Sequence, residues 1–375
     1  MADYQTIEFK ELRVTRPNCS FNTFRQIAKY TVSGYLRGYG TWKRNSNGKL
    51  YRFSPSLCNL QYGLNIPGEK ITDCLRKKNI RYVVVIGDSN GMRYFTALHW
   101  HLSRLPGVQC TQIGKHFGVN WKTYEQTGIY VVHRCQCGWK DSGRCTIGFY
   151  KVGKHKLRQD WVLQARCDIN ASHLGSKFTV NIEYTLVRHT IEKKDEHMCD
   201  TGCQPNSRES IVPTTSDTSQ RFLLSEFFAN PHPDLFIVFG NAHDHMPLQD
   251  MMSDIDTFAK LVDSYVKPPT RLIWLSRFAE DYRNKPLSWR NVRYENGTMS
   301  RMEYLDAANR IMYERMRRRF LNTNRWLLFP DLFQMSKPVL NDYNIDGVHM
   351  KPEWYRHVMS YILQALCIGA EVRAI

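Results

Sequence analysis

A serine, a histidine and an aspartate stand where they could together carry out acyl transfer. The apolar run 83–86 ends in Gly-Asp-Ser at 87–89, and Asp346 and His349 follow far downstream. A serine hydroxyl is a weak nucleophile at neutral pH and needs an imidazole to accept its proton; a carboxylate orients that imidazole and stabilises its charged form. The sequence therefore predicts Ser89 as the nucleophile, His349 as the general acid and base, and Asp346 as the residue that orients His349.

The serine is expected on a tight turn between a strand and a helix. Apolar residues recur at helical spacing from Met92 to Leu105, and Pro106-Gly107 ends that pattern. The first turn of a helix favours developing negative charge, and Gly87 suits a sharp turn because it has no Cβ. We therefore expect the backbone N–H of Ser89 to stabilise an oxyanion.

Each motif also has a purely structural interpretation. Gly-Asp-Ser is common in turns, and Asp-x-x-His can be a surface loop before a helix. Their conjunction favours an acyl-transfer enzyme over a passive binding module, because the serine follows the first buried-strand pattern and the Asp/His pair precedes the last helical pattern.

These residues resemble the SGNH (GDSL-like) hydrolase superfamily. The closer likeness is to its PC-esterase branch, which includes neurexophilin and PC-esterase domain proteins and trichome-birefringence-like proteins. The likeness covers residues 35–100 and 232–367, and it rests on the motifs Gly87-Asp88-Ser89 with Arg93, Asp346-x-x-His349, Trp42, Cys58-Asn59-Leu60, Cys74-Leu75-Arg76 and Leu363-Gln364-Ala365-Leu366-Cys367.

The resemblance implies a reaction and further site residues. It implies work on O-acyl, chiefly O-acetyl, groups of carbohydrate through an acyl-serine intermediate, with an acetyl donor such as acetyl-CoA if the reaction is transfer. It also implies Asn241 as a second oxyanion donor, although the block around it is offset by one residue from the branch's Gly-x-Asn-Asp pattern, and places His243 at the mouth of the pocket. A polar loop leaving a strand is the alternative reading of His243.

Two further residues near Ser89, Arg93 and Asn90, have no catalytic role assigned to them. Arg93 follows Ser89 by one helical turn, where it could bind an acidic substrate or hold the lead-in segment through an ion pair. Asn90 stands where the branch has a small hydroxyl residue or leucine.

The surrounding pattern predicts an α/β fold with a mainly parallel, flavodoxin-like sheet in a three-layer α/β/α arrangement. Apolar runs that alternate with helical patterns are typical of such sheets, which bind ligands beyond the carboxyl ends of their strands. We divide the chain into a lead-in segment at 1–78, an SGNH-like catalytic domain at 79–107 and 220–375, and an inserted cysteine-rich β region with a flexible end at 108–219. Strands are expected at 83–86, 128–132, 146–152, 177–184, 235–239, 272–275 and 326–329, with the main helices starting near 92, 248, 302 and 352.

The composition bounds the partners. The chain has 375 residues, is 42% hydrophobic and carries a formal net charge of +17. A basic surface favours anionic partners such as acidic glycans. Nucleic-acid binding is not expected, because no zinc-finger, RRM or KH signature accompanies the charge, and its densest cluster, Arg315 to Arg319, lies on a helical pattern. No stretch approaches the apolar length of a membrane span, so we expect any anchor to lie outside this chain.

Eleven cysteines favour an oxidising compartment, and seven of them lie between residues 110 and 203. We expect several disulfides, at least one of them within residues 108–210, and a site in the secretory-pathway lumen (Golgi) or outside the cell. No signal peptide is visible at Met1–Lys10, so the cytoplasm is the second interpretation. A zinc site is the alternative use of the central cysteines and histidines, and its spacings match no paired Cys-x2-Cys pattern: His133, Cys135, Cys137, Cys145, His197, Cys199 and Cys203. The catalytic mechanism itself requires no metal.

A rival function belongs to another class. The chain could be a non-catalytic secreted binding or signalling protein on a degenerate esterase scaffold, because folds are reused without their activities.

Overall fold

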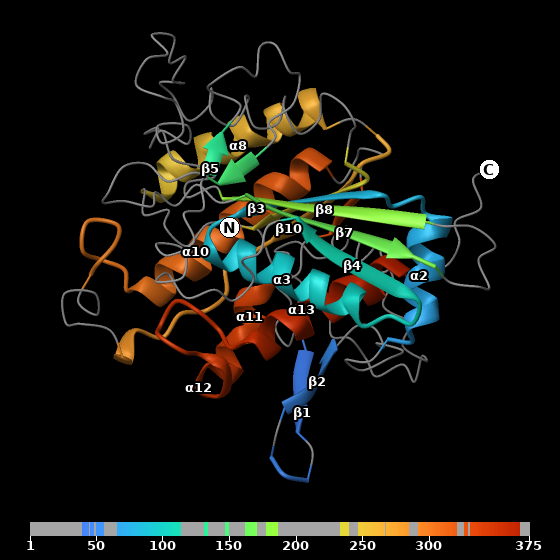
Figure 1. Cartoon of the computed structure of the whole chain (residues 1–375). Coiled ribbons are helices and arrows are strands. Elements are labelled where there is room, and N and C mark those ends of the chain that lie inside the picture. The colour runs from blue at the N-terminus through green and yellow to red at the C-terminus, as the bar shows by residue number, and fades with distance from the viewer. Residues whose placement is uncertain are drawn as a thin grey trace, which may run out of the picture.

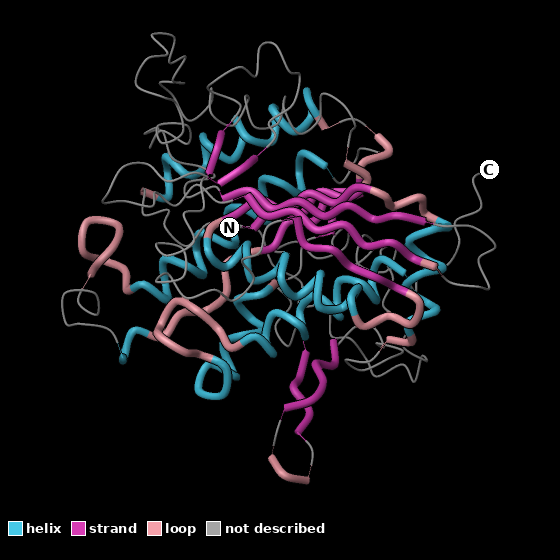
Figure 2. The backbone as a smooth tube through the Cα atoms, in the orientation of Figure 1, coloured by secondary structure: helices cyan, strands magenta, loops and turns pink. Residues whose placement is uncertain are grey.

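The structure is a computed structural model of the chain, and it shows a mixed α/β protein (Figures 1 and 2). It describes residues 40–44, 46–48, 50–55, 66–113, 131–133, 147–149, 162–170, 178–186, 233–239, 247–266, 268–284, 292–320, 326–328 and 331–367.

A seven-stranded, mostly parallel sheet forms the centre of the described structure. Its order is β11-β10-β9-β3-β8-β7-β4, and the five strands from β11 to β8 run parallel. At one edge β7 pairs antiparallel with β8, and β4 pairs antiparallel with β7. The bounds are β3 (Tyr82–Gly87), β4 (Val108–Ile113), β7 (Val162–Ile169), β8 (Phe178–Leu186), β9 (Leu235–Phe239), β10 (Arg271–Leu275) and β11 (Trp326–Leu328).

Strand β3 is apolar throughout because both of its faces are buried. Val83 and Val85 join a hydrophobic cluster that includes side chains of the helices α2 (Gly68–Lys77), α3 (Ser89–Ser103) and α13 (Pro352–Cys367). Val84 and Ile86 join a second cluster with side chains of α8 (Leu248–Tyr265) and α10 (Arg301–Phe320). A strand covered on both faces reads as a continuous apolar run, which is the pattern that predicted it.

The main helices follow the predicted patterns. Their bounds are α2 (Gly68–Lys77), α3 (Ser89–Ser103), α8 (Leu248–Tyr265), α10 (Arg301–Phe320) and α13 (Pro352–Cys367), and shorter elements are η2 (Tyr282–Asn284), α11 (Leu332–Ser336), η3 (Lys337–Val339) and α12 (Leu340–Tyr343). Arg315 and Arg319 on α10 form ion pairs with Asp256 and Asp263 on α8, so part of the predicted arginine face is used between helices. None of the helices in the described ranges is long and apolar enough to cross a membrane.

Part of the region 108–219, which we expected to be an insertion, belongs to the central sheet. Strands β4, β7 and β8 belong to the central sheet, and β8 lies beside β3 itself. Alternate residues of β8 (Phe178, Val180, Ile182 and Tyr184) enter the same cluster as α3. This alternation looks like an antiparallel hairpin in the sequence because only one face of β8 supplies that core. The short strands β5 (Val131–His133) and β6 (Ile147–Phe149) form a separate pair.

A hairpin from the lead-in segment packs near the last helix. It consists of β1 (Gly40–Arg44) and β2 (Leu50–Pro55). The Trp42 indole N–H donates to the Met335 carbonyl at 2.7 Å, and its ring lies 5.9 Å from that of Trp354 on α13. Arg44 donates two hydrogen bonds to Asp342. The lead-in therefore covers the segment that precedes His349.

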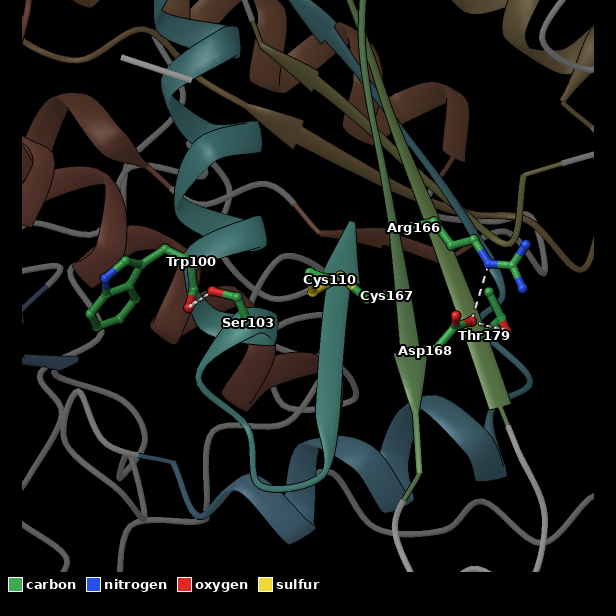
Figure 3. Close-up of a disulfide and its surroundings, with 7 residues drawn as sticks. All are labelled: Trp100, Ser103, Cys110, Arg166, Cys167, Asp168 and Thr179. Carbon is green, nitrogen blue, oxygen red and sulfur yellow. Dashed lines mark hydrogen bonds and ion pairs between the residues drawn. A yellow bond between two sulfur atoms is a disulfide. The ribbon is translucent and has the colours of Figure 1, made fainter. Parts of the chain in front are cut away.

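Two disulfides join described residues, as the cysteine content predicted. Cys74 on α2 is bonded to Cys367 at the end of α13, and Cys110 on β4 to Cys167 on β7. The second pair confirms a bridge within 108–210, because the two cysteines stand directly opposite in the antiparallel ladder. Figure 3 shows this bridge, with Asp168 accepting hydrogen bonds from Arg166 and Thr179 beside it.

The Cys110–Cys167 bridge also explains a cluster of side chains whose types can bind a metal. A nitrogen of His99 lies within 4.8 Å of the sulfurs of Cys110 and Cys167. Both sulfurs are bonded to each other, so neither is a thiolate that could bind a metal. The predicted alternative zinc site lies outside the described residues, apart from the backbone of His133.

Removing the Cys74–Cys367 bridge should destabilise the fold more than removing the other. Its cysteines are 293 residues apart and those of Cys110–Cys167 are 57 apart. The longer loop restricts the unfolded chain more, so Cys74→Ser with Cys367→Ser should lower the free energy of unfolding by about 2–5 kcal/mol. Urea unfolding of the two double variants measures this. A larger loss for the Cys110/Cys167 variant would contradict the loop-length argument.

Candidate active site

The sharp turn after β3 requires glycine at position 87. Gly87 has a φ of 157°, and a Cβ there would lie 2.8 Å from the Cβ of Phe239, the last residue of β9. Asp88 then caps α3, because its Oδ1 accepts from the N–H of Asn90 at 2.8 Å and of Gly91 at 3.4 Å. Ser89 is the first residue of α3, and its own N–H has no acceptor within the helix.

The structure brings Ser89, His349 and Asp346 together. The Oγ of Ser89 lies 2.8 Å from Nε2 of His349, and Nδ1 of His349 lies 2.7 Å from Oδ2 of Asp346. With the proton on Nδ1, the imidazole donates to Asp346 and its Nε2 accepts from the Ser89 hydroxyl. This is the relation of nucleophile, base and orienting carboxylate that acyl transfer needs.

The loop that carries His349 is folded around Asp346. Oδ1 of Asp346 accepts from the N–H of Val348 at 3.1 Å and of His349 at 2.8 Å, which leaves Oδ2 for the imidazole. Gly347 between them has a φ of 98°, a conformation that favours glycine. One carboxylate therefore fixes both the backbone and the ring of His349.

The site is partly open to solvent. The side chains of His349 and Asp346 are 22% and 42% exposed. Burial by itself raises the pKa of Asp346, but hydrogen bonds from the His349 ring and from the loop N–H groups outweigh it, so the pKa lies below its usual value. Asp346 therefore stays ionised in weak acid, as an orienting residue must.

A tyrosine that the sequence pattern does not single out holds the nucleophile turn on the sheet. The Tyr184 hydroxyl, at the end of β8, lies 3.1 Å from the Gly87 carbonyl and 2.7 Å from the Asp88 carbonyl and donates toward both. Burial raises the pKa of Tyr184, so the hydroxyl keeps its proton. The only sequence signal was its place in an alternating strand pattern, which does not indicate a polar role.

Arg93 lies on α3 one turn after Ser89, as predicted, whereas Asn241 and His243 lie outside the described residues. The guanidinium of Arg93 lies 5.8 Å from the ring of Tyr355, and its Nε is buried without a hydrogen-bond partner among the described residues. No ion pair joins Arg93 to the described part of the lead-in, so that predicted structural role gains no support there. Asn241 and His243 fall in the gap after β9, outside the described residues.

The turn of Ser89 lies where the strand order reverses. Counted along the chain, the five parallel strands lie in the order 2-1-3-4-5, with β3 as the first and β9 as the third. Crevices for ligands form at such a reversal, beyond the carboxyl ends of the strands. Phe239, the last residue of β9, lies next to Gly87 at the same carboxyl end of the sheet. The segment with Asn241 follows Phe239 in the chain.

Comparison with known proteins found no relative of this chain. The chain matches no protein-family model and no curated protein.

Proposed function

We propose that this protein is a serine-dependent acyl-transfer enzyme that acts on O-acyl, chiefly O-acetyl, groups of carbohydrate. The observation that carries the chemistry is the continuous chain of contacts from Ser89 through His349 to Asp346, at 2.8 and 2.7 Å. The carbohydrate and acetyl parts of the proposal rest on the sequence resemblance to the PC-esterase branch. No metal takes part in the proposed steps.

The proposed reaction uses each residue at a stated atom. Nε2 of His349 takes the proton of the Ser89 hydroxyl while Oγ attacks the acyl carbonyl, and the N–H of Ser89 stabilises the oxyanion with help from Asn241. His349 then returns the proton to the leaving alcohol or thiol, which leaves an acyl-Ser89 ester. Water or a sugar hydroxyl, deprotonated by His349, attacks that ester and restores Ser89.

The fold supports a site of this kind. The strand order 2-1-3-4-5 is that of flavodoxin-like sheets, and alternate residues of β3 enter two different clusters. We therefore propose the three-layer α/β/α arrangement of the SGNH superfamily for residues 79–107 and 220–375, with β4, β7 and β8 completing the sheet.

One experiment separates enzyme from binding protein. A fluorophosphonate probe that reacts with activated serines should label Ser89, identified by peptide mapping. A folded protein that stays unlabelled would instead support a non-catalytic binding or signalling role. The two disulfides favour the secretory-pathway lumen or the extracellular space over the cytoplasm, so the protein should be produced in a secretory host.

A second experiment separates transfer from hydrolysis, and we favour transfer. The protein is incubated with glycan acceptors and an acetyl donor, either acetyl-CoA or an acetylated sugar. The products are then identified by mass spectrometry. An acetylated glycan is the expected product. Release of acetate alone would identify an esterase.

Arg93 should select substrates that carry negative charge. Because the Nε of Arg93 is buried without a hydrogen-bond partner among the described residues, Arg93→Ala should raise KM for an acidic oligosaccharide by roughly tenfold or more and leave kcat almost unchanged. Steady-state kinetics with an acidic and a neutral acetylated sugar measure this, and Arg93→Lys should retain part of the preference. Equal losses on both sugars, with a lower melting temperature, would assign Arg93 to the fold.

A further inference from the structure

The residue after the nucleophile bonds to the loop that carries the base. Asn90 is 1% exposed, and its Nδ2 donates to the Val348 carbonyl at 3.3 Å. Its Oδ1 accepts from the hydroxyl of Tyr355 at 2.6 Å. Both ends of this amide are therefore occupied by groups from the C-terminal part of the chain, while its backbone N–H is held by Asp88.

Tyr355 completes the connection from the other side of His349. It lies in the first turn of α13, is 1% exposed, and its hydroxyl accepts from the N–H of Met350 at 3.1 Å. Asn90 thus bonds to the residue before His349, and Tyr355 bonds to the residue after it. The backbone on both sides of the base is tied, through two buried side chains, to the residue next to Ser89.

The rings around Tyr355 fix its position. Its ring meets that of Tyr94 on α3 edge-on at 4.9 Å and that of Phe278 at 6.4 Å. Burial is the main cause that raises the pKa of Tyr355, so its hydroxyl keeps its proton and can donate at neutral pH. A leucine at position 90 would fill space but could bond to neither partner.

We propose that Asn90 and Tyr355 are positioning residues that set the distance between Ser89 and His349. The inference rests on the proposed function, because it gives the pair a role in proton transfer. Small displacements of reacting groups are costly in rate, and a loop released on both sides of His349 would sample longer Oγ–Nε2 distances. The alternative is that the pair only stabilises the interface of α3 and α13.

The test compares two tyrosine variants on the same interface. Tyr355→Phe removes a hydroxyl with two partners. Tyr94→Phe removes a buried hydroxyl whose polar neighbour is the Trp354 indole and which bonds neither to Asn90 nor to the loop of His349. We expect Tyr355→Phe to slow fluorophosphonate labelling of Ser89 by about tenfold, and Tyr94→Phe to stay within about twofold of the unaltered protein.

A second readout does not depend on activity. The proton that His349 shares with Asp346 should give a downfield NMR resonance, assigned by its loss in His349→Gln. Tyr355→Phe should broaden it and Tyr94→Phe should preserve it. If the unaltered protein is not labelled, the proposed function fails, whereas this resonance still decides whether the pair positions His349.

Asn90→Ala provides an independent variant in case Tyr355→Phe does not fold. It should slow labelling to a similar extent, and the double variant should lose less than the product of the two single losses, because the two side chains share the hydrogen bond between them. Unchanged labelling and a sharp resonance in Tyr355→Phe would overturn the proposal, as would equal effects in Tyr94→Phe. Additive losses in the double variant would also overturn it.

Discussion

Replacing Ser89 by alanine should lower the rate of acyl transfer by roughly a thousandfold or more while leaving the fold intact. The change removes the hydroxyl that contacts Nε2 of His349, and alanine is well tolerated at the start of a helix. Turnover of an acetylated oligosaccharide and of a small activated acetate ester measures the loss. Labelling by the fluorophosphonate probe should disappear as well.

Ser103→Ala is the matched control for this experiment. Ser103 ends the same helix and is exposed, and among the described residues its hydroxyl donates to the Trp100 carbonyl within α3 alone. Its removal should leave turnover unchanged. A Ser89→Ala protein that keeps full activity would rule out the serine mechanism.

Asp346→Asn should reduce kcat by about ten-thousandfold, as expected when the orienting carboxylate of such a triad becomes an amide. The amide can still accept the N–H groups of Val348 and His349, so the loop should keep its shape. It can no longer hold a proton on Nδ1 of His349 and stabilise the charged ring. The loss should therefore appear in kcat measured near neutral pH rather than in the melting temperature.

The pH dependence of this defect has a defined sign. The pKa of Asp346 is lowered, so the carboxylate is lost only as pH falls through that lowered value. The difference between the variant and the unaltered protein should persist from neutral pH into weak acid. The control is Asp342→Asn, four residues before Asp346. This change alters a partly exposed ion-pair partner of Arg44 and should leave kcat unchanged. Equal kcat values for Asp346→Asn and the unaltered protein would remove Asp346 from the mechanism.

The parts of the fold that the sequence predicted are those whose pattern reflects burial. Strands β3, β9 and β10 are covered on both faces and appear as short apolar runs. The pattern of β8 predicts a strand but not its place beside β3, because pairing depends on contacts between distant segments. Its alternating pattern suited a hairpin equally well.

The candidate site divides in the same way. The grouping of Ser89, Asp346 and His349 could be predicted, because acyl transfer demands those residue types and their motifs are local; their catalytic role stays a proposal. Tyr184, Asn90 and Tyr355 act through contacts with segments about a hundred or more residues away, which no local pattern reveals. Asn241 and His243 remain predictions.

The separation of 260 residues between Ser89 and His349 has a consequence for the timing of biosynthesis. When the ribosome has made β3 and α3, Ser89 is present in the chain, but His349, Tyr355 and Cys367, the partner of Cys74, have not been synthesised. A growing chain therefore carries a serine without a proton acceptor. On the proposed mechanism, the nascent protein should not react with acyl donors until His349 has been made and its loop has folded against α3, and a chain that ends before Asp346 should never react.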